Sequence, residues 1–234
     1  MIELKKITLA FDSKSILQSA DCTFRRGTLT ALVGRNGAGK STLLKVLAAL
    51  DAPKGGEVMV DGKVLHTLTA EARARMISFV STQRVRVANL LCRDVVAIGR
   101  APYTNWMGSM QEQDVAAVES ALTAVGMSDF ATRAIDTLSD GECQRVMIAR
   151  ALAQQTPVIL LDEPTAFLDI PTRFEICRLL ADLAHNQGKT IIFSTHDIDA
   201  AIPVCDSVAV IDNSSISLHA AADAEVVLKS LFSL

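Results

Sequence analysis

The sequence of 234 residues predicts an α/β fold: a core of parallel strands and helices, an N-terminal antiparallel β subdomain and an inserted α-helical subdomain. Three observations predict it. An apolar run at 29–33 leads through a glycine-rich loop into a helical pattern. Further apolar runs near 158, 190 and 208 alternate with helical patterns, as in parallel sheets covered on both faces. From about 86 to 155 the pattern is helical throughout.

The individual elements follow in chain order. Residues 2–33 alternate like a short antiparallel sheet, with Arg26 and Gly27 as a turn. After a loop at 51–56, strand-like pieces are expected at 58–60 and 61–62, and another at 76–82. The clearest amphipathic helix is at 114–122, and later helices are expected at 171–186 and 197–203. Asn213 can accept positive φ in a turn, and 220–228 looks like a short closing helix.

The segment 34–42 fits the phosphate-binding pattern G-x-x-x-x-G-K-[ST] and stands between a strand and a helix. Gly34, Gly37 and Gly39 let successive backbone N–H groups point at phosphate oxygens, and the helix adds the positive end of its dipole. Lys40 would reach the β- and γ-phosphates, Ser41 would ligate Mg²⁺, and Thr42 would bind on the α-phosphate side. Asn36 lies in the same loop and is counted with the nucleotide-binding residues. The alternative is a glycine-rich turn without a ligand.

Two carboxylates end the apolar run 158–161, and Pro164 stops the strand behind them. Ligands gather at the carboxyl ends of parallel strands, so these acids are expected to face the phosphate-binding loop. Asp162 suits a direct or indirect role on Mg²⁺, and Glu163 suits polarising the attacking water as general base. The alternative is that both acids only solvate the end of a strand.

The segment 138–142, which reads L-S-D-G-E, precedes a helical pattern, and Ser139 and Asp140 are both good helix starters. Together with the loop at 34–42 and the acidic strand, it resembles the ATP-binding cassette ATPases, from about residue 2 to about residue 212. Asp140 replaces the family's usual first of two glycines, and Glu142 replaces its usual glutamine. The resemblance implies a P-loop NTPase core (RecA-like) that hydrolyses ATP with Mg²⁺ as a homodimer.

The resemblance also assigns further site residues. Ser139 and Gly141 would contact the γ-phosphate of ATP held by the partner subunit, and Asp169 would cross the dimer interface. Gln83 matches the glutamine that contacts Mg²⁺ and the attacking water, His196 the histidine that contacts the γ-phosphate, and Phe11 the aromatic residue that stacks on adenine. Phe11 suits buried packing equally well. Asp140 would repel a triphosphate, so we expect it to turn away and cap its own helix.

The loop at 99–108 contains the only Trp and the only Tyr of the chain, bounded by Pro and Gly. Ordinary packing would explain these aromatics. The segment also resembles the importer ATPases for iron–siderophore complexes, haem and cobalamin. That resemblance implies a transmembrane permease docked on an exposed apolar patch around 84–108, a periplasmic substrate-binding protein acting indirectly, and a location at the cytoplasmic face of the inner membrane. The alternatives are a soluble cassette ATPase acting in assembly, for instance of iron–sulfur clusters, and a scaffold module without hydrolysis.

Composition limits the setting. We expect one nucleotide-binding domain spanning 1–234, because the motifs are spread over the whole chain. A net charge of −3 gives no basic footprint for nucleic acid. The five cysteines form no C-x-x-C pair, which favours reduced thiols. No apolar run approaches the roughly 20 residues of a membrane helix. Charged residues at 3, 5 and 6 interrupt any signal-peptide pattern.

Overall fold

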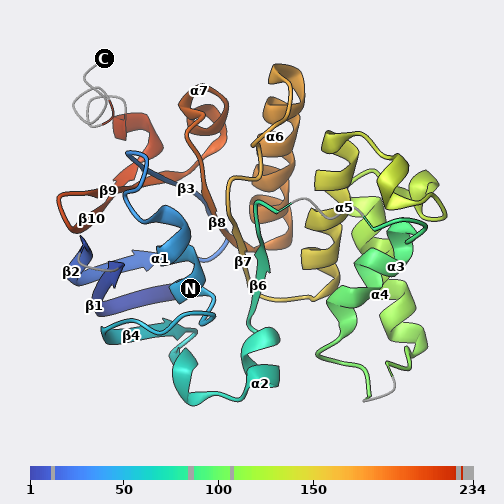
Figure 1. The fold of residues 1–234 in the computed structure, drawn as a ribbon, viewed down its shortest axis with the longest axis horizontal. Helices are drawn as coiled ribbons and strands as arrows, with labels where there is room; N and C mark the ends of the chain where they lie inside the picture. Colours follow the sequence, from blue (N-terminus) through green and yellow to red (C-terminus); the bar gives the residue numbers. More distant parts are fainter. Residues whose placement is uncertain (12–13, 84–86, 106–107, 225–227, 229–234) are drawn as a thin grey trace.

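The computed structural model describes residues 1–11, 14–83, 87–105, 108–224 and 228. Two sheets and a group of helices form its main parts, with the helices α3 to α5 beside the sheets (Figure 1). The predicted fold class is confirmed: an antiparallel sheet near the N-terminus, a mainly parallel sheet with helices, and an inserted helical subdomain.

The antiparallel sheet has the strand order β2-β1-β4-β5. Its strands are β1 (Ile2–Phe11), β2 (Lys14–Phe24), β4 (Gly55–Val60) and β5 (Lys63–Val64). The expected strand at 61–62 is wrong, because Asp61 and Gly62 form the turn between β4 and β5. Both have positive φ, at 46° and 78°, which a two-residue hairpin turn of this type requires.

The second sheet has the order β10-β9-β3-β8-β7-β6. It comprises β3 (Leu29–Gly34), β6 (Ile77–Val80), β7 (Val158–Leu161), β8 (Thr190–Ser194), β9 (Ser207–Asp212) and β10 (Ser215–Ala220). All pairs are parallel except β9 with β10. β3 therefore belongs here and not to the antiparallel sheet expected over 2–33. Asn213 has the expected positive φ, 46°, in the β9–β10 turn.

The helices that accompany the sheets are α1 (Lys40–Leu47), α2 (Ala70–Ala74), α6 (Ile170–Gln187) and α7 (Ile198–Ala201). The helical subdomain contains α3 (Cys92–Ala97), α4 (Glu112–Ala124) and α5 (Asp140–Ala153). Between them the chain forms loops and single 3₁₀ turns, so the helical pattern expected throughout 86–155 is only partly realised. The 3₁₀ turns between α3 and α5 are Ile98–Arg100, Ser128–Phe130 and Ile135–Thr137, and those elsewhere in the described residues are Leu65–Thr67, Ile202–Val204 and Ala221–Asp223. The short closing helix expected at 220–228 is only partly realised, because Ala220 ends β10 and Ala221–Asp223 form a 3₁₀ turn. Residues 225–227 of that prediction lie outside the described residues.

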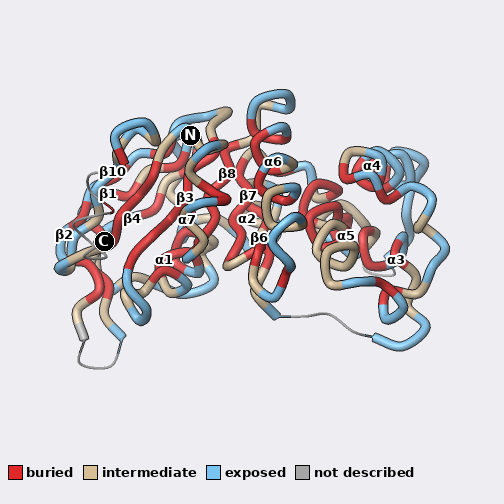
Figure 2. Tube along the Cα trace, turned by 90° about the horizontal axis from the view of Figure 1, so that it is seen from above, coloured by how far each residue is buried: buried red, intermediate tan, exposed pale blue. Residues whose placement is uncertain are grey.

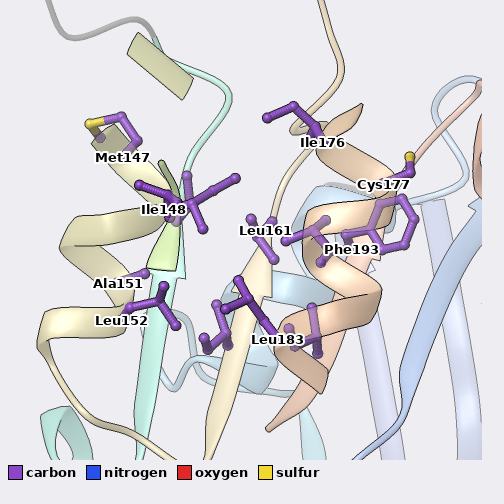
Figure 3. Packing of buried hydrophobic residues seen from close by; sticks show 14 of the residues in the cluster. Met147, Ile148, Ala151, Leu152, Leu161, Ile176, Cys177, Leu183 and Phe193 are labelled. Carbon is purple, nitrogen blue, oxygen red and sulfur yellow. The ribbon is translucent and has the colours of Figure 1, made fainter. Parts of the chain in front are cut away.

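The core consists of two apolar clusters on opposite faces of the parallel sheet. Along β7, Ile159 and Leu161 join the cluster shared with α5 and α6, whereas Val158 and Leu160 join the cluster shared with α1 and the antiparallel sheet. Burial on both faces is what an uninterrupted apolar strand predicts. Buried residues run through the sheets and the inner faces of the helices (Figure 2), and side chains of α5 and α6 flank Leu161 of β7 within one cluster (Figure 3).

A polar cluster joins the helical subdomain to the sheet core. The side chain of Arg100, which is 4% exposed, pairs with Asp114, which is 1% exposed, at 2.8 Å. The guanidinium of Arg100 lies 4.0 Å from the ring centre of Tyr103, and that of Arg75 lies 4.9 Å from the same ring. Tyr103 donates its hydroxyl to Gln154 O, and Gln154 Nε2 donates to Ile77 O at 3.0 Å. These contacts fasten the C-terminal end of α5 to β6.

Among the described residues, no helix has the length and apolar character that crossing a bilayer requires. All five cysteines are free thiols.

Candidate active site

The phosphate-binding loop curves around a hollow at the N-terminus of α1. Gly39 is the N-cap residue, with φ of 95°, and a Cβ at this position would collide with Ile16. Only glycine combines this backbone conformation with so close a neighbour. The hollow is lined by Phe11, Ile16, Asn36, Gly37, Ala38, Gly39, Lys40, Ser41, Thr42 and Glu163. The structure therefore brings most of the predicted loop residues around one space.

Lys40 is buried at the base of this hollow. Its Nζ donates to Gly34 O at 3.0 Å. Burial lowers the pKa of the Lys40 ammonium, while the charges of Glu163 and Asp162 act in the opposite direction. An anion in the hollow would favour the charged form further, so the electrostatics suit a phosphate group.

Asp162 is 8% exposed and accepts two hydrogen bonds on Oδ1. Ser41 Oγ donates to it at 2.9 Å, and Ser194 Oγ donates to it at 2.7 Å. A hydroxyl and a carboxylate thus meet beside the phosphate-binding loop. Hard oxygen ligands of this kind are those that Mg²⁺ prefers, usually together with substrate phosphates. The donor set of Ser41 and Asp162 therefore fits this metal ion.

Glu163 has a backbone conformation that is unusual for its residue type, with φ of 47°. Non-glycine residues in this region are commonly held there at functional sites. Its side chain is 31% exposed, and Oε2 lies 3.7 Å from Nδ1 of the exposed His196. Glu163 and His196, predicted from separate strands, are thus neighbours.

Phe11 is 65% exposed and lies at the edge of the hollow. The alternative that it packs in the core does not hold. An exposed aromatic ring beside a phosphate-binding loop has the position required for stacking on a base.

A second hollow adjoins the first, because Glu163 lines both. Gln83, three residues beyond the end of β6, lines this second hollow together with Glu163. The lining is completed by Thr82, Asp140, Cys143, Gln144, Met147, Ala166, Phe167 and Leu168. The structure places Gln83 near the general-base candidate, as its predicted role requires.

The helix α5 begins at Asp140, so the predicted helix start at the L-S-D-G-E segment is confirmed. Its N-cap is Ser139, which corrects the expectation that Asp140 caps the helix. Ser139 and Glu142 form a capping box: Ser139 N and Oγ each donate to Glu142 Oε2 at 2.8 Å, and Glu142 N donates to Ser139 Oγ. Ser139 is the N-cap residue because Glu142, three residues later, completes a capping box with it. Asp140 lies in the first turn of α5 and lines the second hollow.

The remaining predicted residues lie away from Lys40. Asp169 caps α6 by accepting from Thr172 N at 3.2 Å. A Cβ at Gly141 would lie 2.6 Å from Cγ2 of Thr172, so α5 and α6 approach closely there. None of Ser139, Gly141 and Asp169 lines the hollow around Lys40.

Sequence reasoning missed Ser194, which contacts both acids of the site. A polar residue ending the apolar run 190–194 beside His196 was the available signal.

Taken together, the parallel sheet, the phosphate-binding loop and the acids at the end of β7 define a P-loop nucleotide hydrolase. The family described as "ABC transporter" matches residues 17–166 of the chain. The protein therefore belongs to the ABC transporter family, and within it is an ATP-binding ATPase subunit.

Individual relatives agree with this assignment. The chain is 38% identical to an achromobactin transport ATP-binding protein of Dickeya dadantii, covering 100% of this chain and 88% of that protein. It is 40% identical over 84% of its length to a cobalamin import ATP-binding protein of Halobacterium salinarum, of which it covers 49%.

Solved structures show the same fold. One is a chain of an ABC transporter described as metal-chelate type, in an inward-facing conformation, with a TM-score of 0.86 and 26% identity, covering 100% of this chain and 89% of that one. Another is a dimeric ATP-binding cassette in a post-hydrolysis state bound to ADP and phosphate, with a TM-score of 0.79 and 28% identity, covering 94% and 99% of the two chains.

Proposed function

We propose that this chain is the ATP-hydrolysing subunit of an importer for an iron–siderophore, haem or cobalamin-type substrate. The observation that carries the hydrolytic part is the convergence of Lys40, Asp162 and Glu163 at the end of β7. The cargo class rests on the resemblance of the chain to importer ATPases and on relatives named for achromobactin transport and cobalamin import.

The residues of this chain take distinct roles in that reaction. Lys40 and the backbone of the loop, with Thr42, bind the phosphates, and Phe11 stacks on adenine. Ser41, Asp162 and Gln83 hold Mg²⁺, which when bound neutralises charge on the β- and γ-phosphates. Glu163 accepts a proton from the attacking water, and His196 contacts the γ-phosphate beside it.

The complete site requires two copies of the chain. Ser139, Gly141 and Asp169 do not line the hollow around Lys40 of their own chain. In a head-to-tail pair, Ser139 and Gly141 of the second copy would contact the γ-phosphate, and Asp169 would cross the interface. A dimeric cassette bound to ADP and phosphate among the structural relatives supports this arrangement. ATP closes the pair because it binds the closed state better than the open one.

The partner on the membrane side is a permease, and the chain acts at the cytoplasmic face of the inner membrane. Val87 and Ile98 are 50% and 56% exposed on the helical subdomain, and they offer apolar surface for a docking helix. Tyr103 packs inside the polar cluster, and Trp106 lies outside the described residues. A periplasmic substrate-binding protein would deliver the cargo to the permease. Relatives named for transport and import do not favour the assembly-ATPase alternative.

Replacing Glu163 tests the hydrolytic assignment. Glu163→Gln removes the base while keeping the size of the side chain, so the variant should retain ATP and accumulate as a dimer. Size-exclusion chromatography with ATP measures the dimer, and phosphate release measures turnover. Lys40→Ala should stay monomeric, because it loses the phosphate contact. A Glu163→Gln variant that stays monomeric with ATP and hydrolyses it at the wild-type rate would contradict the assignment.

Co-purification tests the importer assignment separately. The chain, expressed with its neighbouring genes, should purify with a multi-spanning membrane protein. Recovery of only non-membrane partners would favour the assembly ATPase.

A further inference from the structure

Ser194, the last residue of β8, contacts both acids of the active site with one hydroxyl. Its side chain is 0% exposed. The Oγ donates to Asp162 Oδ1 at 2.7 Å and accepts from the backbone N–H of Glu163 at 2.8 Å. A serine hydroxyl has one proton and two lone pairs, so both bonds are compatible.

These bonds continue to the phosphate-binding loop. Ser41 Oγ donates to the same Oδ1 of Asp162 at 2.9 Å. The carboxylate of Asp162 is therefore held between a hydroxyl of α1 and a hydroxyl of β8. Partners that hydrogen-bond a metal ligand from behind fix its orientation and tune the metal site.

The bond to Glu163 acts on the backbone. Glu163 has φ of 47°, a conformation that is strained for a non-glycine residue and persists only where its surroundings enforce it. The N–H of Glu163 is anchored on Ser194. Because the backbone sets where the side chain points, this anchor directs the Glu163 carboxylate.

We propose that Ser194 is a positioning residue of the active site, which orients Asp162 toward Mg²⁺ and holds Glu163 in its strained backbone conformation. This inference rests on the proposed function. The simpler alternative is a buried serine that only satisfies its neighbours' hydrogen bonds and affects stability alone.

The same strand offers a matched control. Thr190 lies four residues before Ser194, so its side chain is on the same face of β8. It is 1% exposed, and its Oγ1 has no hydrogen-bond partner among the described residues. Thr190→Val therefore removes a buried hydroxyl from β8 without touching the active site.

The experiment compares the wild-type chain with Ser194→Ala, Ser194→Cys, Ser194→Thr and Thr190→Val. Steady-state ATP hydrolysis is measured against Mg²⁺ concentration at saturating ATP. A second readout, independent of turnover, is the rise in melting temperature caused by ATP with Mg²⁺, compared with ATP and EDTA. Ser194→Cys fills the site with a slightly larger side chain that is only a weak donor, so it tests the hydroxyl if the alanine variant folds poorly.

Ser194→Ala and Ser194→Cys should lower kcat about tenfold, the usual effect of removing a group that orients a metal ligand. The Mg²⁺ concentration for half-maximal activity should rise several-fold, and the Mg²⁺-dependent part of the melting-temperature rise should shrink. The rise with EDTA should not change. Ser194→Thr retains the hydroxyl and should restore these quantities, and Thr190→Val should match the wild type. A lower fraction of folded protein would not move the Mg²⁺ dependence.

Three results would overturn the inference: alanine and cysteine variants with wild-type Mg²⁺ dependence, a threonine variant as impaired as alanine, or the same losses in Thr190→Val. If the wild type itself does not hydrolyse ATP, the proposed function fails. The Mg²⁺-dependent stabilisation still reports on Ser194 in that case.

Discussion

The hydroxyl of Ser139 is already committed within its own helix. It carries one proton, which it donates to the Glu142 carboxylate, and a carboxylate can only accept. The backbone N–H of Ser139, which also donates to Glu142, lowers the pKa of that carboxyl, with the Ser139 hydroxyl adding to the effect. The charged form therefore persists at neutral pH. In the proposed pair, this bond competes with donation from Ser139 to the partner's ATP.

Replacing Glu142 with glutamine should relieve this competition. The amide can donate to Ser139 Oγ, which leaves the hydroxyl proton for a phosphate and removes a negative charge beside it. In a Glu163→Gln background, the ATP concentration that gives half-maximal dimer should fall several-fold, measured by size-exclusion chromatography. Glu175→Gln is a control, since it removes a carboxylate that pairs with Arg145 of α5. If Glu142→Gln and Glu175→Gln shift the ATP concentration for half-maximal dimer equally, the total charge of the chain and not the hydrogen bond of Ser139 sets that concentration.

Phe11 is 65% exposed and adds little to the core, so its replacement should affect nucleotide binding and not stability. Phe11→Ala should weaken ATP binding by about 1–3 kcal/mol, the usual worth of stacking on a base, with little change in melting temperature. Titration of a fluorescent ATP analogue measures the affinity. Phe11→Tyr should bind as the wild type does, and Leu50→Ala is a control because it truncates a residue of similar exposure, 61%. Unchanged affinity in Phe11→Ala would exclude the stacking role.

At this scale the sequence predicts the residues whose chemistry depends on motif spacing, such as Lys40 and Glu163. It does not predict that Ser194 bonds to both acids, because that depends on the pairing of β7 with β8. It also does not decide between Ser139 and Asp140 as the N-cap, since both residue types cap helices well. The capping box with Glu142 makes Ser139 the N-cap residue, and the three-residue spacing of Ser139 and Glu142 in the sequence indicates that box.

Among the elements, α5 and α6 depend on a glycine for their close approach. Gly141→Ala would place a methyl 2.6 Å from Cγ2 of Thr172, so it should destabilise the fold by about 1–3 kcal/mol. Thr172→Ser removes that Cγ2 and should restore the stability, measured by urea unfolding. Combining Gly141→Ala with Thr172→Ser also separates the role of Gly141 in helix packing from its role in ATP hydrolysis.

If Gly141 also serves close approach to the partner's nucleotide, the double variant Gly141→Ala with Thr172→Ser should be stable but still impaired in ATP hydrolysis. Thr172→Ser alone is the control for the loss of the methyl. A double variant with full activity would limit Gly141 to helix packing.

The elements themselves were largely predictable. Apolar runs located β3, β7, β8 and β9, because strands buried on both faces need uninterrupted apolar residues. The turn at Asp61 and Gly62 was misread, although Asp-Gly is a strong hairpin signal. The non-helical stretches within 86–155 were missed because their apolar side chains, such as Met127 and Ile135, are also buried.

For the molecule as a whole, the ion pair of Arg100 and Asp114 secures the helical subdomain. The backbone N–H of Gln111 holds the pKa of Asp114 below its usual value, and Arg100 adds to this while burial opposes it. A lowered carboxyl pKa means stability that is fully present above about pH 3.8, the unfolded value, and is lost as pH falls through the folded value.

Asp114→Asn should therefore cost about 3–5 kcal/mol near neutral pH, since it leaves the buried Arg100 guanidinium without its opposite charge. The difference from the wild type should shrink as the pH falls below about 3.8, where the wild type begins to lose the ionic part of this contribution. Urea unfolding across pH measures both effects. Glu71→Gln, which breaks the exposed pair with Arg75, should cost less than about 1 kcal/mol. A cost for Asp114→Asn that does not vary with pH would refute the ionic contribution.

The position of this cluster has a mechanical consequence. It fastens α5 at its C-terminal end, through Gln154, while Ser139 stands at the opposite end. The helix has 14 residues and is therefore about 21 Å long. If the helical subdomain turns about this anchor, Ser139 is the end of α5 that moves furthest. A swing of about ten degrees would carry Ser139 along an arc of about 4 Å, more than the length of a hydrogen bond.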